Sequence, residues 1–252
     1  MANSFLKAAK KVLKTEADAL EKLKNDLPID FSDLVEFIQN LTGRVIVSGV
    51  GKSGHIGNKI AATLASTGTP AYFVHATEAS HGDLGMITEQ DLCLLISNSG
   101  ETVEMFDILT HARRFSIPIA TMSSNCESTL VKAANFQLCL PMADEACPIG
   151  MAPTTSTTMM LALGDALAVA LMEAKSFNAE NFKIFHPGGK LGAKLMTVSQ
   201  LMHKDDAIPL VKTETSMKET LLTMSTKGFG IAAIVDEIGS LVGVITDGDL
   251  RR

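Results

Sequence analysis

The chain has 252 residues, of which 46% are hydrophobic and 20% charged, so it can build a packed core and lacks the composition of a disordered protein. A formal net charge of −6 argues against nucleic acid as the main ligand, because a polyanion is bound by a basic surface. The length fits one large domain, alone or with a small appendage.

The first forty residues are predicted to be helical, because apolar residues recur three and four positions apart. The two apolar faces consist of Phe5, Ala8, Ala9, Val12 and Leu13, and of Leu34, Phe37, Ile38 and Leu41. The N-terminal segment mixes lysines with acids and has no apolar run before a small-residue cleavage site, so no export signal is expected.

Five short apolar runs then alternate with helix-length stretches, at 44–48, 71–74, 91–97, 118–122 and 136–140. Runs of this kind are typical of strands buried on both faces. Strand and helix in alternation predict an α/β fold, an αβα sandwich with a five-stranded parallel sheet. A long helix is expected from 154 to 175. The longest uncharged stretch, 146–164, contains two prolines and a threonine cluster and is not expected to span a membrane.

The four cysteines are scattered without a C-x-x-C spacing, which predicts reduced thiols in a cytoplasmic protein. They are Cys93, Cys126, Cys139 and Cys147. Cys93 and Cys139 stand in apolar runs that suit a core position. Only Cys147, close to Glu145, is a candidate for a role in the reaction.

Two loops are candidates for binding a phosphate, because ligands of parallel sheets bind beyond the carboxyl ends of the strands. The first, VIVSGVGKSGHIG, resembles G-x-G-x-x-G, but an acid that would close the second strand of a dinucleotide site is missing. A P-loop is excluded because position 46 is Ile46. Glycines such as Gly51, with Lys52 and Ser53 at a helix start, can still approach an anion.

The second loop, ISNSGETVE, follows the next buried strand and carries three hydroxyls close together. Ser97, Ser99 and Thr102, with the backbone around Gly100, could surround a phosphate monoester. A simple cluster of helix-capping residues is the alternative. The second glycine loop on the same sheet edge favours anion binding.

The two loops together resemble the sugar isomerase (SIS) domain, a family that binds phosphosugars. DEACPIGMAPTTSTTMMLALGDALAVAL, FHPGGKLG and a C-terminal stretch ending in VGVITDGDL narrow the resemblance to SIS proteins with a cystathionine-β-synthase (CBS) motif, the arabinose-5-phosphate isomerases. The predicted domains are a SIS domain with N-terminal helices at 1–197 and a partial CBS module at 198–252. The latter contains a helix at 217–224 and two strands joined by the turn 237–240. Only one CBS motif fits before Arg252, so we expect a truncated module that binds nucleotide weakly or not at all.

The resemblance implies an aldose-ketose isomerase that interconverts D-ribulose 5-phosphate and D-arabinose 5-phosphate through an enediolate, at the start of 3-deoxy-D-manno-octulosonate synthesis for lipopolysaccharide or capsule. It also implies a homotetramer with sites near subunit interfaces. The catalytic residues carried over by motif are Lys52, Glu104, Glu145 and His186, with His81 as a neighbour. Glu101 and Glu104 both stand in the second loop, and the family pattern favours Glu104.

The isomerisation needs a base for a proton next to the carbonyl and a donor for the enediolate, but no cofactor. We expect burial or a neighbouring acid to raise the pKa of Glu104 or Glu145 toward about 6 to 7. Lys52 could stabilise the enediolate or only face the phosphate. His186 could open the sugar ring or shuttle a proton.

Two alternatives are weighed at this point. His81, Glu145, Cys147 and His186 match no compact ligand motif, so an essential metal is not expected. A non-catalytic phosphosugar-binding regulator would keep the hydroxyls without needing the two acids. The two acids therefore favour an enzyme over a sensor, and the expected partner is a phosphosugar rather than a nucleic acid or a membrane.

Overall fold

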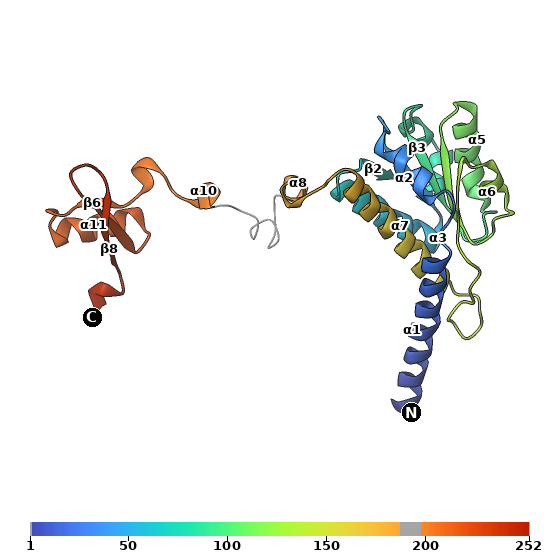
Figure 1. Cartoon of the computed structure of the whole chain (residues 1–252), viewed down its shortest axis with the longest axis horizontal. Helices are drawn as coiled ribbons and strands as arrows, with labels where there is room; N and C mark the ends of the chain where they lie inside the picture. Colours follow the sequence, from blue (N-terminus) through green and yellow to red (C-terminus); the bar gives the residue numbers. More distant parts are fainter. Residues whose placement is uncertain (1, 187–197, 252) are drawn as a thin grey trace. The chain divides into compact units, whose positions relative to one another are not determined.

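The computed structural model describes residues 2–186 and 198–251, which form two compact units (Figure 1). One unit consists of residues 2–186 and the other of residues 198–251. The predicted boundary between 197 and 198 lies at the end of the undescribed stretch and stays a prediction.

The first unit is built on a five-stranded parallel sheet with the strand order β2-β1-β3-β4-β5, which confirms the predicted α/β fold. The strands are β1 (Val45–Gly49), β2 (Ala71–Phe73), β3 (Leu92–Ile96), β4 (Ile119–Ser123) and β5 (Phe136–Cys139). Because β1 and β3 are neighbours, with Gly49 opposite Ile96, the loops that follow them begin side by side.

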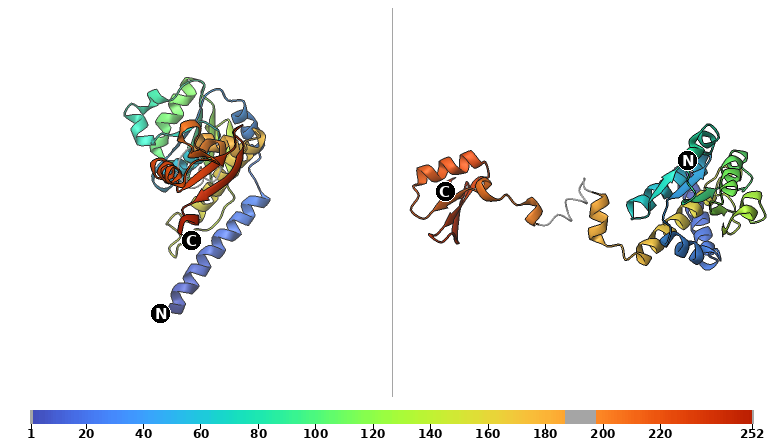
Figure 2. Two further views of the ribbon diagram at one scale, coloured as in Figure 1. Left: turned by 90° about the vertical axis from the view of Figure 1, so that its left-hand side faces the viewer. Right: turned by 90° about the horizontal axis from the view of Figure 1, so that it is seen from above.

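Side chains alternate between two cores, one on each face of the sheet. Val45, Val47 and Leu94 pack into the first core, whereas Ile46 and Leu95 pack into the second. The first core is covered by α1 (Ala2–Asn25), α2 (Phe31–Gln39), α3 (Gly51–Ser66) and α7 (Thr155–Ala174). The second is covered by α4 (Ala76–Ser80), α5 (Phe106–Arg114) and α6 (Thr129–Ala133). Figure 2 shows the resulting three layers from two further sides.

The prediction that all five strands are buried on both faces holds for β1, β3 and β4 and is wrong for the two edge strands. Tyr72 in β2 is 55% exposed, and Phe136 in β5 is only half-buried. An edge strand lacks a neighbour on one side, so its side chains are covered less completely.

Helices α3 and α7 lie alongside each other and run in the same direction. Lys59 pairs with Asp165, and Gly164 leaves room for Ile60, so position 60 of α3 meets position 164 of α7. The first turns of both helices therefore lie at the carboxyl edge of the sheet. At the other end, Lys175 Nζ donates to Gly68 O, just before β2 begins.

Helix α7 is the one helix of the described residues that is long and apolar enough to cross a membrane. Half of its apolar window is buried within the first unit. Met160, Leu163 and Leu167 belong to the core that α7 shares with the sheet. Packing in the core thus accounts for the apolar composition of this helix.

Helix α1 is buried only in its second half. Ala19 and Leu23 pack into the core, whereas Phe5 is 72% and Leu13 67% exposed. The apolar face predicted for residues 5–13 therefore forms on the helix but is not covered by the described part of the chain.

The second unit is a small three-stranded sheet with one long helix. It contains α10 (Val198–Leu201), β6 (Leu210–Lys212), α11 (Met217–Lys227), β7 (Ile231–Val235) and β8 (Leu241–Thr246), in the strand order β6-β7-β8. Ser216 and Glu219 form a capping box at the start of α11, and Gly228 ends it with a positive φ of 74°. The predicted hairpin is present, with Asp236 N donating to Ser240 O in its turn.

Candidate functional site

The first loop places the start of α3 at the carboxyl edge of the sheet with its N–H groups uncapped by a side chain. The residue before the helix is Val50, which cannot cap it, and Gly51 adopts a positive φ of 58° that favours glycine. Lys52 and Ser53 follow in the first turn, Lys52 exposed and Ser53 half-buried. Free N–H groups at the start of a 16-residue helix favour an anion.

The second loop is folded tightly around the hydroxyl of Ser97. This buried hydroxyl accepts from Gly100 N at 3.0 Å and lies 2.8 Å from Thr102 Oγ1. The Ser99 hydroxyl, on an exposed residue, accepts from Glu101 N at 3.2 Å. Ser97 therefore shapes the loop from inside, while Ser99 stands at its surface.

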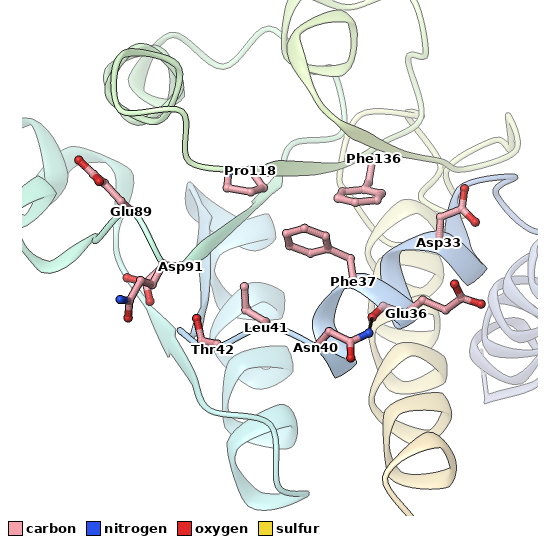
Figure 3. A pocket seen from close by; sticks show the side chains of 11 residues that line it. Asp33, Glu36, Phe37, Asn40, Leu41, Thr42, Glu89, Asp91, Pro118 and Phe136 are labelled. Carbon is pink, nitrogen blue, oxygen red and sulfur yellow. Dashed lines mark hydrogen bonds between the residues drawn. The ribbon is translucent and has the colours of Figure 1, made fainter.

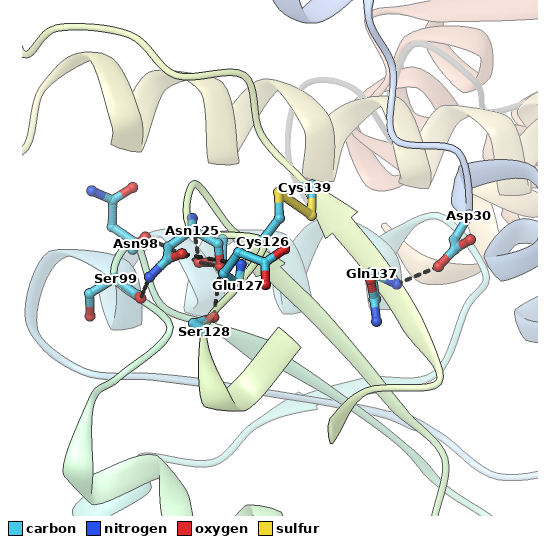
Figure 4. Close-up of a disulfide and its surroundings, with 10 residues drawn as sticks. Asp30, Asn98, Ser99, Asn125, Cys126, Glu127, Ser128, Gln137 and Cys139 are labelled. Carbon is cyan, nitrogen blue, oxygen red and sulfur yellow. Dashed lines mark hydrogen bonds between the residues drawn. A yellow bond between two sulfur atoms is a disulfide. The ribbon is translucent and has the colours of Figure 1, made fainter. Parts of the chain in front are cut away.

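A third loop, residues 124–128 after β4, braces the second loop (Figure 4). Ser124 Oγ donates to Asn98 Oδ1 at 2.8 Å, and Asn125 Nδ2 donates to Ser99 O at 3.2 Å. Sequence reasoning missed this loop. The polar run SSNCES directly after a buried strand was the available signal, since every strand of a parallel sheet ends at the same edge.

Cys126 in this third loop forms a disulfide with Cys139 at the end of β5 (Figure 4). The prediction of reduced thiols is therefore wrong for these two residues. Ser123 lies opposite Cys139 in the sheet, so the loop after β4 folds back beside β5. The resulting Cα–Cα distance of 5.6 Å is one that a disulfide spans. Cys93 and Cys147 are free, and burial raises the pKa of the Cys93 thiol to about 12.

The two acids of the second loop have different surroundings. The Glu101 carboxylate accepts from Thr129 N at 2.7 Å and so caps the first turn of α6. Glu104 lies in the short 3-10 turn η2 (Val103–Met105), is exposed, and makes no side-chain hydrogen bond with the described residues. This difference supports Glu104, rather than Glu101, as the acid available to a ligand.

Glu145 lies in the loop between β5 and α7 and is held at the start of α7. Its Oε2 accepts from Thr154 N at 2.7 Å, from Thr154 Oγ1 at 2.9 Å and from Ser156 N at 3.4 Å. Its Oε1 accepts from Ser156 Oγ. The carboxylate thus caps the positive end of a 20-residue helix.

These contacts contradict the expectation of a raised pKa at Glu145. Burial on its own raises the pKa of this carboxyl group, but the hydrogen bonds from Ser156 and Thr154 outweigh burial and hold the pKa below its ordinary value. Donors that point at the ionised form stabilise it. Glu145 is therefore an anion at neutral pH.

Cys147 is surrounded by backbone donors in the same loop. Its Sγ accepts from Met151 N and Ala152 N, both at 3.1 Å. Burial raises the pKa of the thiol, but the backbone N–H groups together outweigh burial and lower the pKa below its usual range. Within residues 2–186 and 198–251, no three His, Cys, Asp or Glu side chains come together as metal ligands do.

The two candidate histidines lie far apart in the fold. His81 ends α4, which packs against η2, the turn that carries Glu104. His186 ends α8 (Ala179–Phe185), its Nδ1 lies 2.9 Å from Phe182 O, and its ring stacks on Phe182. Helix α8 follows α7 and so begins near the amino edge of the sheet, the end opposite to the loops. The rest of the FHPGGKLG motif, 187–192, lies outside the described residues.

The carboxyl edge thus brings together the two loops, Glu104 and, through the parallel start of α7, Glu145. The pairing of position 60 with position 164 places Lys52 at the level of about position 156 in α7. Within one chain, His186 is separated from these residues by the length of α7, about 30 Å for 20 residues.

The comparisons with known proteins agree with this geometry. Residues 40–170 match the SIS domain family, and residues 198–252 match the CBS domain family. The arabinose 5-phosphate isomerase KdsD of Yersinia pestis is 51% identical over 249 residues, which cover 98% of this chain and 76% of that protein. The enzyme of the same name from Pseudomonas aeruginosa is 49% identical over the same coverage. Among solved structures, an Escherichia coli CFT073 protein in complex with arabinose 5-phosphate is 39% identical, with a TM-score of 0.71 over 73% of this chain and 98% of that chain.

Proposed function

This chain belongs to the arabinose 5-phosphate isomerases of the SIS domain family, and on that premise we propose that it interconverts D-arabinose 5-phosphate and D-ribulose 5-phosphate. The choice of substrate rests on the 51% sequence identity with the Yersinia pestis enzyme over nearly the whole chain. The non-catalytic regulator considered as an alternative has no observation in its favour, because both acids and Lys52 stand at the loop edge of the sheet.

The phosphate binds at the carboxyl edge, between the uncapped start of α3 and the loop 97–102. This placement is supported by the positive φ of Gly51 and of Gly100, which let the backbone approach a ligand closely. Gly100 is irreplaceable by a larger residue, because a Cβ there would lie 1.9 Å from Ser128 Oγ. Lys52 and Ser53 project from the same helix start, and Ser99 and Thr102 complete the second wall.

Glu104 is the base. Its carboxylate takes the proton from C2 of the aldose while the carbonyl oxygen O1 gains a proton, which gives the enediol. The Glu104 carboxyl, whose proton can exchange with solvent, then gives a proton to C1 as the C2 hydroxyl loses its own, so the reaction is balanced without an oxidant or a cofactor. The exposed, unbonded carboxylate of Glu104 supports this role, and Lys52 supplies positive charge to the enediolate oxygens.

The proposal also covers the assembly of the enzyme, its location and its pathway. His186 acts in a second copy of the chain, because α7 separates it from the loops of its own copy, and a homotetramer with sites at subunit contacts meets this need. The enzyme works in the cytoplasm, without a metal or cofactor. Its product supplies 3-deoxy-D-manno-octulosonate synthesis for lipopolysaccharide or capsule.

The test follows hydrogen at C2 by NMR. The purified chain is incubated with arabinose 5-phosphate in D₂O and a chelator, and we expect both ribulose 5-phosphate and deuterium at C2. Glu104→Gln should lower the rate by about 10²- to 10⁴-fold. Glu101→Gln is the matched control and should keep the rate, since its amide oxygen can still accept from Thr129 N.

Two results would count against the proposal. Wild-type protein that neither exchanges C2 hydrogen nor forms the ketose is not this isomerase. If Glu104→Gln turns over at the parent rate, the base is another residue.

A further inference from the structure

Four donors converge on the carboxylate of Glu145, and all of them come from the first turn of α7 or the residue before it. They are the N–H and hydroxyl of Thr154 and the N–H and hydroxyl of Ser156. Thr154 Oγ1 also accepts from Ala146 N at 2.9 Å, so the loop closes on itself directly beside Glu145. The carboxylate is therefore fixed in position before any substrate arrives.

Oε2 of Glu145 accepts three of these hydrogen bonds and Oε1 accepts one. The four donors stabilise the ionised form of the carboxylate, which makes Glu145 a weaker base than a carboxylate without such donors. Glu104 makes no side-chain hydrogen bond with the described residues and is the better candidate for proton transfer.

The donors around Glu145 are all neutral. Its negative charge is held in place without being cancelled, because Glu145 has no cationic partner within 4 Å among the described residues. Helix α3, whose first turn carries Lys52, lies alongside α7, so the charge of Glu145 stands at the carboxyl edge of the sheet, where the candidate loops lie.

We propose that Thr154 and Ser156 are positioning residues, which hold Glu145 as a fixed anion at the carboxyl edge while Glu104 transfers the proton. The inference rests on the proposed isomerase function. Thr154 and Ser156 act through Glu145 and do not touch the reacting atoms. Their contribution is to kcat, since the phosphate is held by the loops at 49–53 and 97–102.

The experiment measures kcat and KM of the full chain with arabinose 5-phosphate for Ser156→Ala and Thr154→Val. Each variant removes one hydroxyl donor to an ionised group, and we expect kcat to fall about tenfold with KM changed less than about twofold. The conservative variants Ser156→Thr and Thr154→Ser keep the hydroxyl and should restore most of kcat. A purely structural role would lower the amount of folded enzyme and leave kcat per folded molecule unchanged.

Thr157→Val is the matched control. Thr157 stands one residue further along α7, and its hydroxyl donates to Thr154 O rather than to Glu145. Its kcat should stay at the wild-type value. Unchanged kcat in both Ser156→Ala and Thr154→Val would overturn this proposal, while the wild-type rate in the same assay would uphold the isomerase. A wild-type enzyme without turnover would overturn both.

Discussion

Each edge of the five-stranded sheet holds a carboxylate that accepts at least four hydrogen bonds, Asp91 at the amino edge and Glu145 at the carboxyl edge. Asp91 accepts from the backbone and guanidinium of Arg44 and from the N–H and hydroxyl of Thr88. Its side chain is 1% exposed. Glu145 accepts a similar number of bonds from Thr154 and Ser156.

The two carboxylates differ in what neutralises them. Arg44 cancels the charge of Asp91 at 3.0 Å and ties the start of β1 to the start of β3, so this pair is part of the framework. Glu145 has only neutral donors and keeps its charge. The number of hydrogen bonds alone does not tell a structural acid from a functional one in this fold, whereas the presence or absence of a cationic partner does.

The amino edge also holds a cavity that is unrelated to the candidate site. A cavity of about 670 Å³ opens at the amino edge, with Phe37, Leu41, Pro118 and Phe136 around its apolar part (Figure 3). None of the predicted site residues lines it. The carboxyl ends of the parallel strands thus indicate a candidate site at the edge opposite to this cavity.

Asp91→Asn is expected to have the largest effect among the changes that should affect the two edges differently, and this effect is on stability. The substitution leaves Arg44 without its buried partner, which typically costs about 3 to 5 kcal/mol. Urea unfolding should show this loss of stability, and kcat/KM of the folded fraction should stay within about twofold of the wild type. A loss of turnover in folded protein would contradict the division between the edges.

Glu145→Gln is the matched control at the other edge. It keeps the size of the side chain and removes the charge, so we expect kcat to fall by about 10²-fold. The free energy of unfolding should change less than in Asp91→Asn, because Glu145 is only half-buried and leaves no unpaired cation.

A smaller effect on the free energy of unfolding is expected when the pH is lowered. Burial alone raises the pKa of Asp91, but hydrogen bonds from Arg44 and Thr88 hold it below its ordinary value. A lowered folded-state pKa means that the stabilisation is complete above the unfolded-state pKa of about 3.9 and is lost as the pH falls through the folded value. The difference in unfolding free energy between wild type and Asp91→Asn should therefore shrink below about pH 4, by at most about 1.4 kcal/mol per pH unit. A constant difference down to pH 2 would show that the charge of Asp91 does not carry its stabilisation.

The sheet and its functional edge could be predicted because they depend on local pattern. Apolar runs such as 91–97 mark buried strands, and glycine and hydroxyl residues directly after them mark the carboxyl edge. Runs of three or four residues do not tell a central strand from an edge strand, so the exposure of Tyr72 could not be foreseen.

The missed features depend on contacts between residues that no motif links. Cys126 and Cys139 are 13 positions apart and meet only because the loop after β4 folds back along β5. The expectation of a raised pKa at Glu145 rests on burial or a neighbouring acid, the two causes that the sequence suggests. The lowering comes from Thr154 and Ser156, nine and eleven residues away, once their loop closes on the start of α7.

The smallest expected effect concerns the cavity at the amino edge. Phe136 packs against Phe37 with ring centroids 5.1 Å apart, and an aromatic pair of this kind contributes about 0.5 to 1.5 kcal/mol beyond its buried area. Phe136→Leu should therefore lower the free energy of unfolding by about 1 kcal/mol, and Phe37→Leu in the same background should add less than it does alone. Because the cavity lies at the edge opposite to Glu104 and Glu145, kcat and KM should both stay at wild-type values. A rise in KM for arabinose 5-phosphate in Phe136→Leu would mean that this cavity communicates with the substrate, and the separation of a structural edge from a functional edge would no longer hold.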